Sequence, residues 1–569
     1  MADDKGSSSL LPTLEELQHW TAILGRAQQL MLEHAAQAAT PSSSGIEDLA
    51  QAQADIWTRS FEFWQNAVSG YGSEAALKKA EQDKRFSAPE WQSNAFFDLI
   101  RQSYVVACDR LMESVDAYPG VDEETRRKLR FGTRAMLDAL SPSNFPFTNP
   151  LVLQRTIDTG GENLLKGLEN ILHDLARGQL THSDPNAFEL GRDMAMTPGK
   201  VIKRTPLFEL IHYAPTTPNV IETPLVIFPP WINRFYILDL NAKKSFIRWV
   251  LDQGISIFLV SWKSADESIA DTDVEDYVLA QIEAIDTVRT LLTVDSVHVI
   301  GYCVAGTTLA ATLGYLAARG EETKVKSATF FAAQVDFTSA GDLGLFVGDE
   351  QLEFIRQLST RGFLDGRYMA ATFNLLRGRD LIWNYVASNY LLGENAPPFD
   401  LLHWNGDTTN LPARWHQSYL THFYRDNLLI QPGGIVIEGV PIDLARVRTP
   451  TYVQASREDH IAPAESVWKI THHLRGPTRF VLAGSGHIAG VINPPAAGKY
   501  SYWTNDRKVD TLAEFADGAT ETRGSWWPDW ISWLKQLSSV QVPATGARIP
   551  GKGALPPLAD APGDYVRER

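Results

Sequence analysis

The stretch that decides the fold runs from residue 296 to residue 318 and reads SVHVIGYCVAGTTLAATLGYLAA. Ser296 to Ile300 is an apolar run of strand length, and Thr307 to Ala318 has the small and apolar residues of a buried helix. Between them, Gly301-Tyr302-Cys303-Val304-Ala305-Gly306 must turn the chain sharply. Small residues let one backbone pass close to another in such a turn. The stretch therefore predicts a strand, a tight turn that exposes Cys303, and a helix.

The turn matches the nucleophile elbow G-x-S-x-G with two departures. Cys303 stands in place of the usual serine, and Ala305 stands in place of the last glycine. Alanine fits the turn if its φ is negative. The N-terminus of the following helix points its positive end at the thiol, which favours the thiolate. Cys303 is therefore a candidate nucleophile, and the alternative is a buried structural thiol in a tight turn.

Strand-length apolar runs alternate with helical patterns on both sides of this stretch. Near-continuous apolar strands separated by helices indicate an α/β domain with a parallel sheet covered on both faces. The expected strands are Val201-Ile202, Leu207 to Tyr213, Pro224 to Phe228, Ile255 to Trp262, Ala328 to Gln334, Pro450 to Ala455 and Thr478 to Ala483, and the expected helices are Leu238 to Gln253, Val274 to Leu292 and Pro528 to Leu537.

The chain is expected to divide near residue 200. Residues 1–199 show helical periodicity, for example in 14–32, 56–64 and 96–111, and no strand alternation, which predicts an all-helical N-terminal domain. Residues 200–569 form the expected catalytic domain. An insertion at about 339–448 separates two of its strands, and an insertion of that size is typical of a lid. The last 30 or so residues, rich in Pro, Gly and Ala, predict an extended tail.

Two polar side chains follow the late strands of the expected sheet. Asp459 lies in Ser456-Arg457-Glu458-Asp459-His460, and His487 ends Gly484-Ser485-Gly486-His487. A carboxylate and then a histidine, both downstream of the nucleophile, is the chain order of the α/β-hydrolase fold. We predict that His487 removes the proton from Cys303 and that Asp459 orients or charges the imidazole.

Other roles remain open for several residues. Asp459 could be a turn-capping aspartate, His487 a structural loop histidine, and His460 a rival base. Asp336, which follows the 328–334 run, is an alternative acid. Cys108 lies in an apolar helical stretch and is expected to be a core thiol. Three tryptophans near the C-terminus are expected to pack rather than to bind a ligand: Trp526, Trp527 and Trp530.

An oxyanion hole needs two backbone N–H groups. One is expected at Val304, directly after the nucleophile. The other should come from the loop after the strand that ends at Phe228, Pro229-Pro230-Trp231-Ile232-Asn233. The two prolines cannot donate, so the candidates are Trp231 and Ile232.

The composition argues against several kinds of partner. The net charge of −16 opposes nucleic acid as the main partner, because neutralising phosphates needs clustered Lys and Arg. No apolar run is long enough to span a bilayer. The 2 cysteines provide no disulfide framework, so a reducing, cytoplasmic setting is expected. We expect no metal ion and no cofactor.

A cysteine nucleophile suits acyl transfer. Exchange between a thiol and a thioester is nearly isoenergetic, so an acyl group can pass from coenzyme A (CoA) to Cys303 without becoming trapped. The thiolate also leaves more readily than an alkoxide, so the acyl group can then pass to an alcohol. This favours transfer to a hydroxyl group over simple hydrolysis.

Motifs along nearly the whole chain resemble those of class I polyhydroxyalkanoate synthases. In the helical part they are Asp83-Lys84-Arg85-Phe86 and Ser141-Pro142-Ser143-Asn144-Phe145. In the catalytic part they are Pro229-Pro230-Trp231-Ile232-Asn233, Gly301-Tyr302-Cys303-Val304, Gln334-Val335-Asp336-Phe337, His403-Trp404-Asn405, Ser456-Arg457-Glu458-Asp459-His460-Ile461 and the run from Gly486 to Pro495.

The resemblance implies an acyltransferase that polymerises (R)-3-hydroxyacyl-CoA, with 3-hydroxybutyryl-CoA the expected monomer, and releases CoA. The growing polyester is carried on Cys303, and Asp459 helps His487 or itself deprotonates the incoming 3-hydroxyl group. Trp404 and His460 are expected to contact substrate. Acyl-CoA is thus the substrate and not a cofactor.

The resemblance also implies a homodimer, and a cytoplasmic enzyme that ends on the surface of the polyester granule. Two other functions stay open. A thioesterase or polyester depolymerase of the same fold would release free acid. A non-catalytic granule scaffold would act through its helical domain and would not need Cys303, Asp459 or His487.

Overall fold

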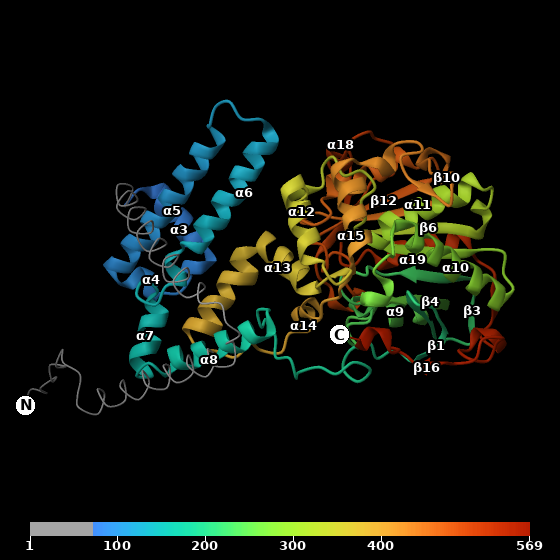
Figure 1. Ribbon diagram of the computed structural model, residues 1–569, viewed down its shortest axis with the longest axis horizontal. Helices are drawn as coiled ribbons and strands as arrows, with labels where there is room; N and C mark the ends of the chain where they lie inside the picture. Colours follow the sequence, from blue (N-terminus) through green and yellow to red (C-terminus); the bar gives the residue numbers. More distant parts are fainter. Residues whose placement is uncertain (1–71, 569) are drawn as a thin grey trace, which may run out of the picture. The chain divides into compact units, whose positions relative to one another are not determined.

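The computed structural model describes residues 72–568, so the helical stretches expected at 14–32 and 56–64 lie outside the described residues. The chain forms two compact units (Figure 1). The described residues up to Asp184, together with Ala371–Pro397, make the helical unit; Pro185–Ala370 and the residues from Pro398 onward make the catalytic unit. This division differs from the expected one at residue 199/200 in two ways. The boundary comes earlier, and part of the expected insertion belongs to the helical unit.

The helical unit is an all-α bundle in which α5 and α6 run side by side (Figure 1). Its small core is aromatic: Phe86 packs edge-on against Trp91 and Tyr104, with ring centroids 4.8 and 5.8 Å apart. The helices are α3 (Glu74–Gln82), α4 (Glu90–Ser93), α5 (Ala95–Asp116), α6 (Glu123–Ala139), α7 (Pro150–Asp158) and α8 (Glu162–Arg177), with the π-helical turns η8 (Arg379–Trp383) and η9 (Val386–Leu391) from the insertion. The helix expected at 96–111 is confirmed as part of α5.

The segment Ala371–Pro397 is held in this unit by α8. The side chain of Asn163 donates to the carbonyl of Leu391 over 2.7 Å. A Cβ atom at Gly167 would lie only 1.8 Å from the carbonyl oxygen of Tyr390, so the close approach requires glycine there. Such contacts between residues more than 200 positions apart carry no local sequence signal.

The catalytic unit is built on a mixed sheet of 12 strands within the described residues. The central strands are parallel, in the order β4-β3-β5-β6-β11-β12, and antiparallel strands extend both edges. The strands are β1 (Gly199–Arg204), β2 (Phe208–Tyr213), β3 (Asn219–Phe228), β4 (Ile255–Trp262), β5 (Val297–Tyr302), β6 (Val325–Phe331), β11 (Thr451–Ser456), β12 (Thr478–Ala483), β13 (Ser501–Thr504), β14 (Thr520–Arg523), β15 (Gln541–Pro543) and β16 (Ala559–Asp560).

Helices cover both faces of the sheet. The chain passes from β3 to β4 through α9 and then crosses back over β3 to β5 through α10. Since parallel crossovers are right-handed, this reversal puts α9 and α10 on opposite faces. Phe246 of α9 packs against Trp527 and Trp530 of α19, so these two helices share a face. The helices are α9 (Phe246–Asp252), α10 (Val274–Leu292), α11 (Val304–Ala318), α16 (Ala464–Trp468), α17 (Ile470–His473), α18 (Leu512–Asp517) and α19 (Trp527–Leu537). Among the described residues, none of the helices has the length and apolar character needed to cross a membrane.

The structure corrects three local expectations. The helix expected at Leu238–Gln253 begins only at Phe246, because the Ser245 side chain caps it by accepting the Arg248 N–H at 2.9 Å. The strand expected at Ala328–Gln334 is β6, three residues earlier at each end. The C-terminal residues are not only an extended tail: β15 pairs with β3, and β16 pairs with β1.

The expected insertion, 339–448, separates β6 from β11. Outside Ala371–Pro397 it packs within the catalytic unit, where Trp415 stacks on Tyr419 and meets Trp231 edge-on. Its elements include α12 (Asp349–Leu358), β7 (Phe363–Leu364), α13 (Gly366–Leu376), α14 (Asp400–Gly406), β8 (Leu411–Pro412), α15 (Ala413–Ser418), the π-helical η10 (Tyr419–Arg425), β9 (Val436–Ile437) and β10 (Val440–Pro441).

Candidate active site

Cys303 lies in a strained turn between β5 and α11. Its φ of 52° and ψ of −125° are unusual for a residue with a side chain. The turn is anchored by the Cys303 N–H, which donates to the carbonyl of Phe331 over 2.9 Å. A Cβ atom at Gly301 would lie 2.6 Å from the Cα atom of Gly306, and one at Gly306 would lie 2.4 Å from the Cβ atom of Ala333. The two glycines are therefore required by the close packing of the turn.

Ala305 fits this turn without strain. It lies in the first turn of α11 and is not among the described residues with positive φ. Its carbonyl accepts a hydrogen bond of 3.0 Å from the buried side chain of Gln281. The departure from the usual glycine is therefore compatible with the elbow, because the φ of Ala305 is not positive.

His487 and Asp459 form a buried pair at the ends of the two loops that follow β12 and β11. The Nδ1 atom of His487 lies 2.7 Å from Oδ2 of Asp459, whose side chain is fully buried. The other carboxylate oxygen, Oδ1, accepts the backbone N–H groups of Ile461 and Ala462 at 2.8 and 2.9 Å. Both oxygens of Asp459 are therefore engaged, and because Nδ1 of His487 is used by Asp459, Nε2 is the ring nitrogen left to interact with Cys303.

The environment of His487 stabilises its protonated form. Burial alone would lower the pKa of His487, but Asp459 and Cys303 raise it well above its usual range through their charges and through hydrogen bonds with the ring. The three residues are thus brought together, and their catalytic roles stay a prediction. In this arrangement a thiolate on Cys303 could attack a carbonyl carbon, with an imidazolium on His487 beside it and Asp459 stabilising the imidazolium.

Tryptophans at the start of α19 hold the loop that carries His487. The indole N–H of Trp526 donates to the carbonyl of Gly490 at 2.8 Å, and that of Trp527 donates to Val491 at 2.9 Å. Together with Trp530, both are fully buried, so the expectation that they pack rather than bind a ligand is confirmed. On the opposite side, the hydroxyl of Tyr302 donates to the carbonyl of His487 itself.

The loop expected to supply the second oxyanion donor lies beside the nucleophile. Phe228, the last residue of β3, pairs in register with Gly301 of β5, so the loop 229–233 and the elbow leave the sheet at the same edge. Within residues 72–568, the backbone N–H groups of Val304 and Ile232 donate to no protein acceptor. Both amides are therefore available to a ligand, and their oxyanion role stays a prediction.

The two expected substrate-contact residues lie in different settings. Trp404 of α14 is buried, and its indole N–H donates to the carbonyl of Arg234 at 2.7 Å. Its polar atom is thus already used to hold the chain next to the 229–233 loop. His460 follows Asp459 in its loop and is partly exposed. Contact of either residue with substrate stays a prediction.

Asp336, the alternative acid, does not pair with His487. Its carboxylate accepts hydrogen bonds from Thr338 and from the side chain of Asn427, and it lies 3.3 Å from Nε2 of His473. Asn427 belongs to the insertion and has a left-handed backbone, with φ of 48°. The contacts of Asp336 therefore tie the insertion, at Asn427, to the loop after β6.

Two tyrosines that the sequence analysis did not single out lie near Cys303. Both belong to η10 of the insertion; Tyr419 is buried, and Tyr424 is partly buried. The ring centroid of Tyr424 lies 4.6 Å from that of Phe337 and 5.5 Å from that of Tyr419. Burial raises the pKa of each tyrosine, and the charge of Cys303 raises it further, so both side chains lie within the electrostatic influence of the sulfur. Over 100 residues separate them from Cys303, so no spacing could have revealed them.

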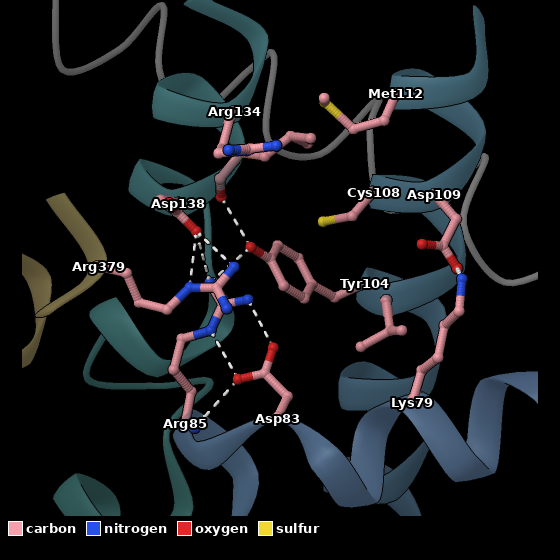
Figure 2. Close-up of a pocket in the computed structure, with 12 residues that line it drawn as sticks. Lys79, Asp83, Arg85, Tyr104, Cys108, Asp109, Met112, Arg134, Asp138 and Arg379 are labelled. Carbon is pink, nitrogen blue, oxygen red and sulfur yellow. Dashed lines mark hydrogen bonds and ion pairs between the residues drawn. The ribbon is translucent and has the colours of Figure 1, made fainter. Parts of the chain in front are cut away.

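A cavity of about 260 Å³ lies within the helical unit (Figure 2). Figure 2 shows Arg85 between Asp83 and Asp138, with Arg379 also reaching Asp138. These charges neutralise one another, which is typical of a structural ion-pair network. Cys108 lines the same cavity, and burial raises the pKa of its thiol to about 11, which fits a core thiol rather than a reactive one. The network joins the 83–86 motif to the segment Ala371–Pro397.

Comparisons with known proteins agree with this geometry. A family profile described as the N-terminus of poly-beta-hydroxybutyrate polymerase (PhaC) matches residues 82–250, and one described as the alpha/beta hydrolase fold matches residues 224–494. The catalytic unit thus has the α/β-hydrolase fold, as predicted.

Curated relatives match over most of their length. A poly(3-hydroxyalkanoate) polymerase of Methylorubrum extorquens is 44% identical, with 99% of this chain and 93% of the relative covered. Poly(3-hydroxyalkanoate) polymerase subunits PhaC of Rhizobium meliloti and Cupriavidus necator are 43% and 41% identical, covering 90% and 86% of this chain and 84% and 83% of the relatives. The resemblance drawn from the motifs is confirmed, and the chain belongs to the poly(3-hydroxyalkanoate) polymerase family.

Proposed function

We propose that this enzyme, an acyltransferase of that family, polymerises (R)-3-hydroxyacyl-CoA, and 3-hydroxybutyryl-CoA in particular, through a thioester on Cys303. The observation that carries the proposal is the placement of His487 between Asp459 and Cys303 in a chain of this family. That arrangement supplies a nucleophile and a base to the acyl chemistry that the relatives' names describe.

In the first step, the Cys303 thiolate attacks the carbonyl carbon of the acyl-CoA thioester. A bond forms between sulfur and carbon, and the carbonyl π electrons move to the oxygen, where the N–H groups of Val304 and Ile232 stabilise the charge. The intermediate then collapses, the bond to the CoA sulfur breaks, and CoA leaves. The imidazolium of His487 protonates the departing thiolate.

In the second step, the 3-hydroxyl group of a monomer or chain end attacks the acyl group on Cys303. The hydroxyl proton goes to Nε2 of His487, an ester bond forms, and the Cys303 thiolate is released. Asp459 is poorly placed to take that proton itself, because Oδ1 already accepts two backbone N–H groups and Oδ2 pairs with His487. This favours His487 as the base, with Asp459 balancing the imidazolium charge.

The insertion acts as a lid in this scheme. Tyr419 is buried, Tyr424 is partly buried, and the charge of Cys303 contributes to the raised pKa of each. Both side chains would therefore help to exclude the water that hydrolyses the acyl thioester. We also propose that the enzyme works as a homodimer on the surface of the polyester granule in the cytoplasm. Support comes from the family and from apolar side chains exposed on α7 and α8, such as Ile157 and Leu175, which suit contact with an apolar polymer.

The test uses the pure protein and (R)-3-hydroxybutyryl-CoA, with thiol release and turbidity followed together. We expect both signals to rise, to be absent in Cys303→Ala and to persist in Cys108→Ala, which removes the other cysteine. Thiol release into a clear solution, with free 3-hydroxybutyrate, would instead identify a thioesterase. Polymer formation by Cys303→Ala would exclude the covalent mechanism.

A further inference from the structure

A single hydroxyl group spans the loop that carries Ile232. Oγ1 of Thr409 donates a hydrogen bond of 2.6 Å to the carbonyl of Trp231 and accepts one of 2.9 Å from the N–H of Asn233. Thr409 is only 5% exposed, so water competes little for either bond. The hydroxyl thus forms hydrogen bonds to the loop on both sides of Ile232.

The geometry of the peptide bond lets this contact determine where the Ile232 N–H points. The carbonyl of Trp231 and the N–H of Ile232 belong to one planar trans peptide, in which the two groups point in opposite directions. Holding the carbonyl towards Thr409 therefore directs the Ile232 N–H away from Thr409. The second bond fixes the next peptide at Asn233, whose φ of 71° reverses the chain. Because Phe228 pairs with Gly301, this loop lies at the edge of the sheet where Cys303 is presented.

Thr409 is itself held rigidly in the catalytic unit. The next residue, Asn410, accepts the N–H of Ala265 and returns a side-chain hydrogen bond of 3.0 Å to the carbonyl of Ala265. The backbone also packs tightly against Gly366, where a Cβ atom would lie 2.4 Å from the carbonyl oxygen of Thr409. Because Thr409 is held in place, its hydroxyl group can hold the 229–233 loop in one conformation.

A neighbouring contact supports the same loop. The side chain of Arg234 forms a buried ion pair with Asp407 at 3.3 Å, while its carbonyl accepts the indole N–H of Trp404. The residues 404–409 thus hold the chain from Trp231 to Arg234 at several points, and Thr409 is the one adjacent to the candidate oxyanion donor.

We propose that Thr409 is a positioning residue for the oxyanion hole, which orients the Ile232 N–H towards the thioester oxygen during attack by Cys303. The inference rests on the proposed function, and it assigns to the insertion a part in catalysis besides excluding water. Removing an oxyanion donor outright slows enzymes by about 10²- to 10³-fold, so releasing its orientation should slow acylation by about 10- to 100-fold.

The test compares Thr409→Val with Thr409→Ser, both with Cys108→Ala so that Cys303 is the one thiol. Valine keeps the shape of threonine but loses both hydrogen bonds, whereas serine keeps the hydroxyl group. Two reactions of Cys303 are timed: acylation by (R)-3-hydroxybutyryl-CoA, measured as the single-turnover burst of CoA, and alkylation by iodoacetamide. Alkylation needs the thiolate but creates no oxyanion.

We expect acylation of Cys303 in Thr409→Val to be about 10- to 100-fold slower than in the parent, with the alkylation rate of Cys303 and the KM for the substrate little changed. In Thr409→Ser, acylation of Cys303 should return to within about threefold of the parent rate. Equal slowing of both reactions would mean that the thiolate, not the oxyanion, was disturbed, and would overturn the inference. Unchanged acylation in Thr409→Val would also overturn it.

Two controls separate this result from other failures. A melting temperature for each variant shows whether the fold is kept, and the serine variant preserves the test if valine does not fold. If the parent with intact Thr409 releases no CoA, the proposed function fails, whereas normal polymerisation by the parent and by Thr409→Val rejects only the role of Thr409.

Discussion

Replacing Asp459 by Asn should separate the ionisation of Cys303 from the transfer of protons by His487. The carboxylate now receives the His487 Nδ1 hydrogen at 2.7 Å and two backbone N–H groups on its other oxygen. The Asn side chain can keep its oxygen on the two backbone N–H groups, but its NH₂ group then faces the ring. Nδ1 must become an acceptor, so the proton moves to Nε2, the atom that should receive a proton from substrate.

The magnitude follows from two losses. Asp459 is the leading group that raises the pKa of His487 against the opposing effect of burial, so the imidazolium that accompanies the thiolate is lost near neutral pH. An unassisted cysteine is ionised to only a few per cent at pH 7, so alkylation of Cys303 should slow by about 10- to 30-fold. Loss of the proton transfer adds a further factor, and we expect polymerisation to fall by about 10³- to 10⁴-fold, as when the triad aspartate of a serine protease becomes Asn.

The assay measures iodoacetamide alkylation of Cys303 in a Cys108→Ala background between pH 5 and pH 10, beside CoA release. The alkylation defect should vanish at high pH, where hydroxide ionises the thiol, while the defect in CoA release should persist. Asp336→Asn is the matched control, since it changes the other candidate acid, which does not pair with His487. If Asp459→Asn kept the parent's alkylation profile and turnover, or if Asp336→Asn lost them at a temperature at which that variant is still folded, the assignment of Asp459 would be wrong.

Three further predictions concern the elbow, the insertion and the helical unit. Gly306→Ala places a Cβ atom 2.4 Å from that of Ala333. We therefore expect the free energy of unfolding in urea titrations to fall by about 1–3 kcal/mol, and the alkylation of Cys303 to slow. Full stability with normal alkylation would contradict the packing of the turn. Burial would raise the pKa of Asp336, but hydrogen bonds from His473, Thr338 and Asn427 lower it, so the ionised carboxylate stabilises the fold above its unfolded pKa of about 4, and this stabilisation is lost as the pH falls below that value. Asp336→Asn should therefore lower the melting temperature more at pH 7 than at pH 3. An equal loss at both pH values would show that the carboxylate does not stabilise the fold in this way. Asp138→Ala leaves the cations of Arg85 and Arg379 without that carboxylate, so limited proteolysis should cut Ala371–Pro397 faster than in the parent, and an unchanged rate would show that the ion pairs do not hold the segment.

The residues that the sequence revealed are those whose role shows in their immediate neighbours. Cys303 lies between an apolar strand and a helix of small residues, and Asp459 and His487 each end a loop directly after a strand. Parallel strands bring their carboxyl ends to one edge of a sheet, so the chain order alone predicts that the three meet. The loop 229–233 was found in the same way, through the strand that precedes it.

The residues that the sequence missed act across long separations. Thr409 holds a loop 178 residues before it, and neither the threonine nor the loop has a local pattern that points to the other. Tyr424 lies in a π-helical turn more than 100 residues after Cys303, and the residues of that turn have no special periodicity. The sequence places the segment Ala371–Pro397 in an insertion of the catalytic domain. Its position in the helical unit depends on a hydrogen bond from α8 to a backbone carbonyl and on close packing at Gly167, and neither contact produces an apolar spacing in the sequence.

The covalent intermediate tests the central claim most directly. The parent and the Cys303→Ala variant are each mixed with (R)-3-hydroxybutyryl-CoA, stopped in acid within one turnover, digested and measured by mass spectrometry. The account predicts a 3-hydroxybutyryl thioester, or a short oligomer of it, on the peptide that contains Cys303, and none on the peptide that contains Cys108. Polymer formed without any acyl group on Cys303, or an acyl group on another residue, would contradict it.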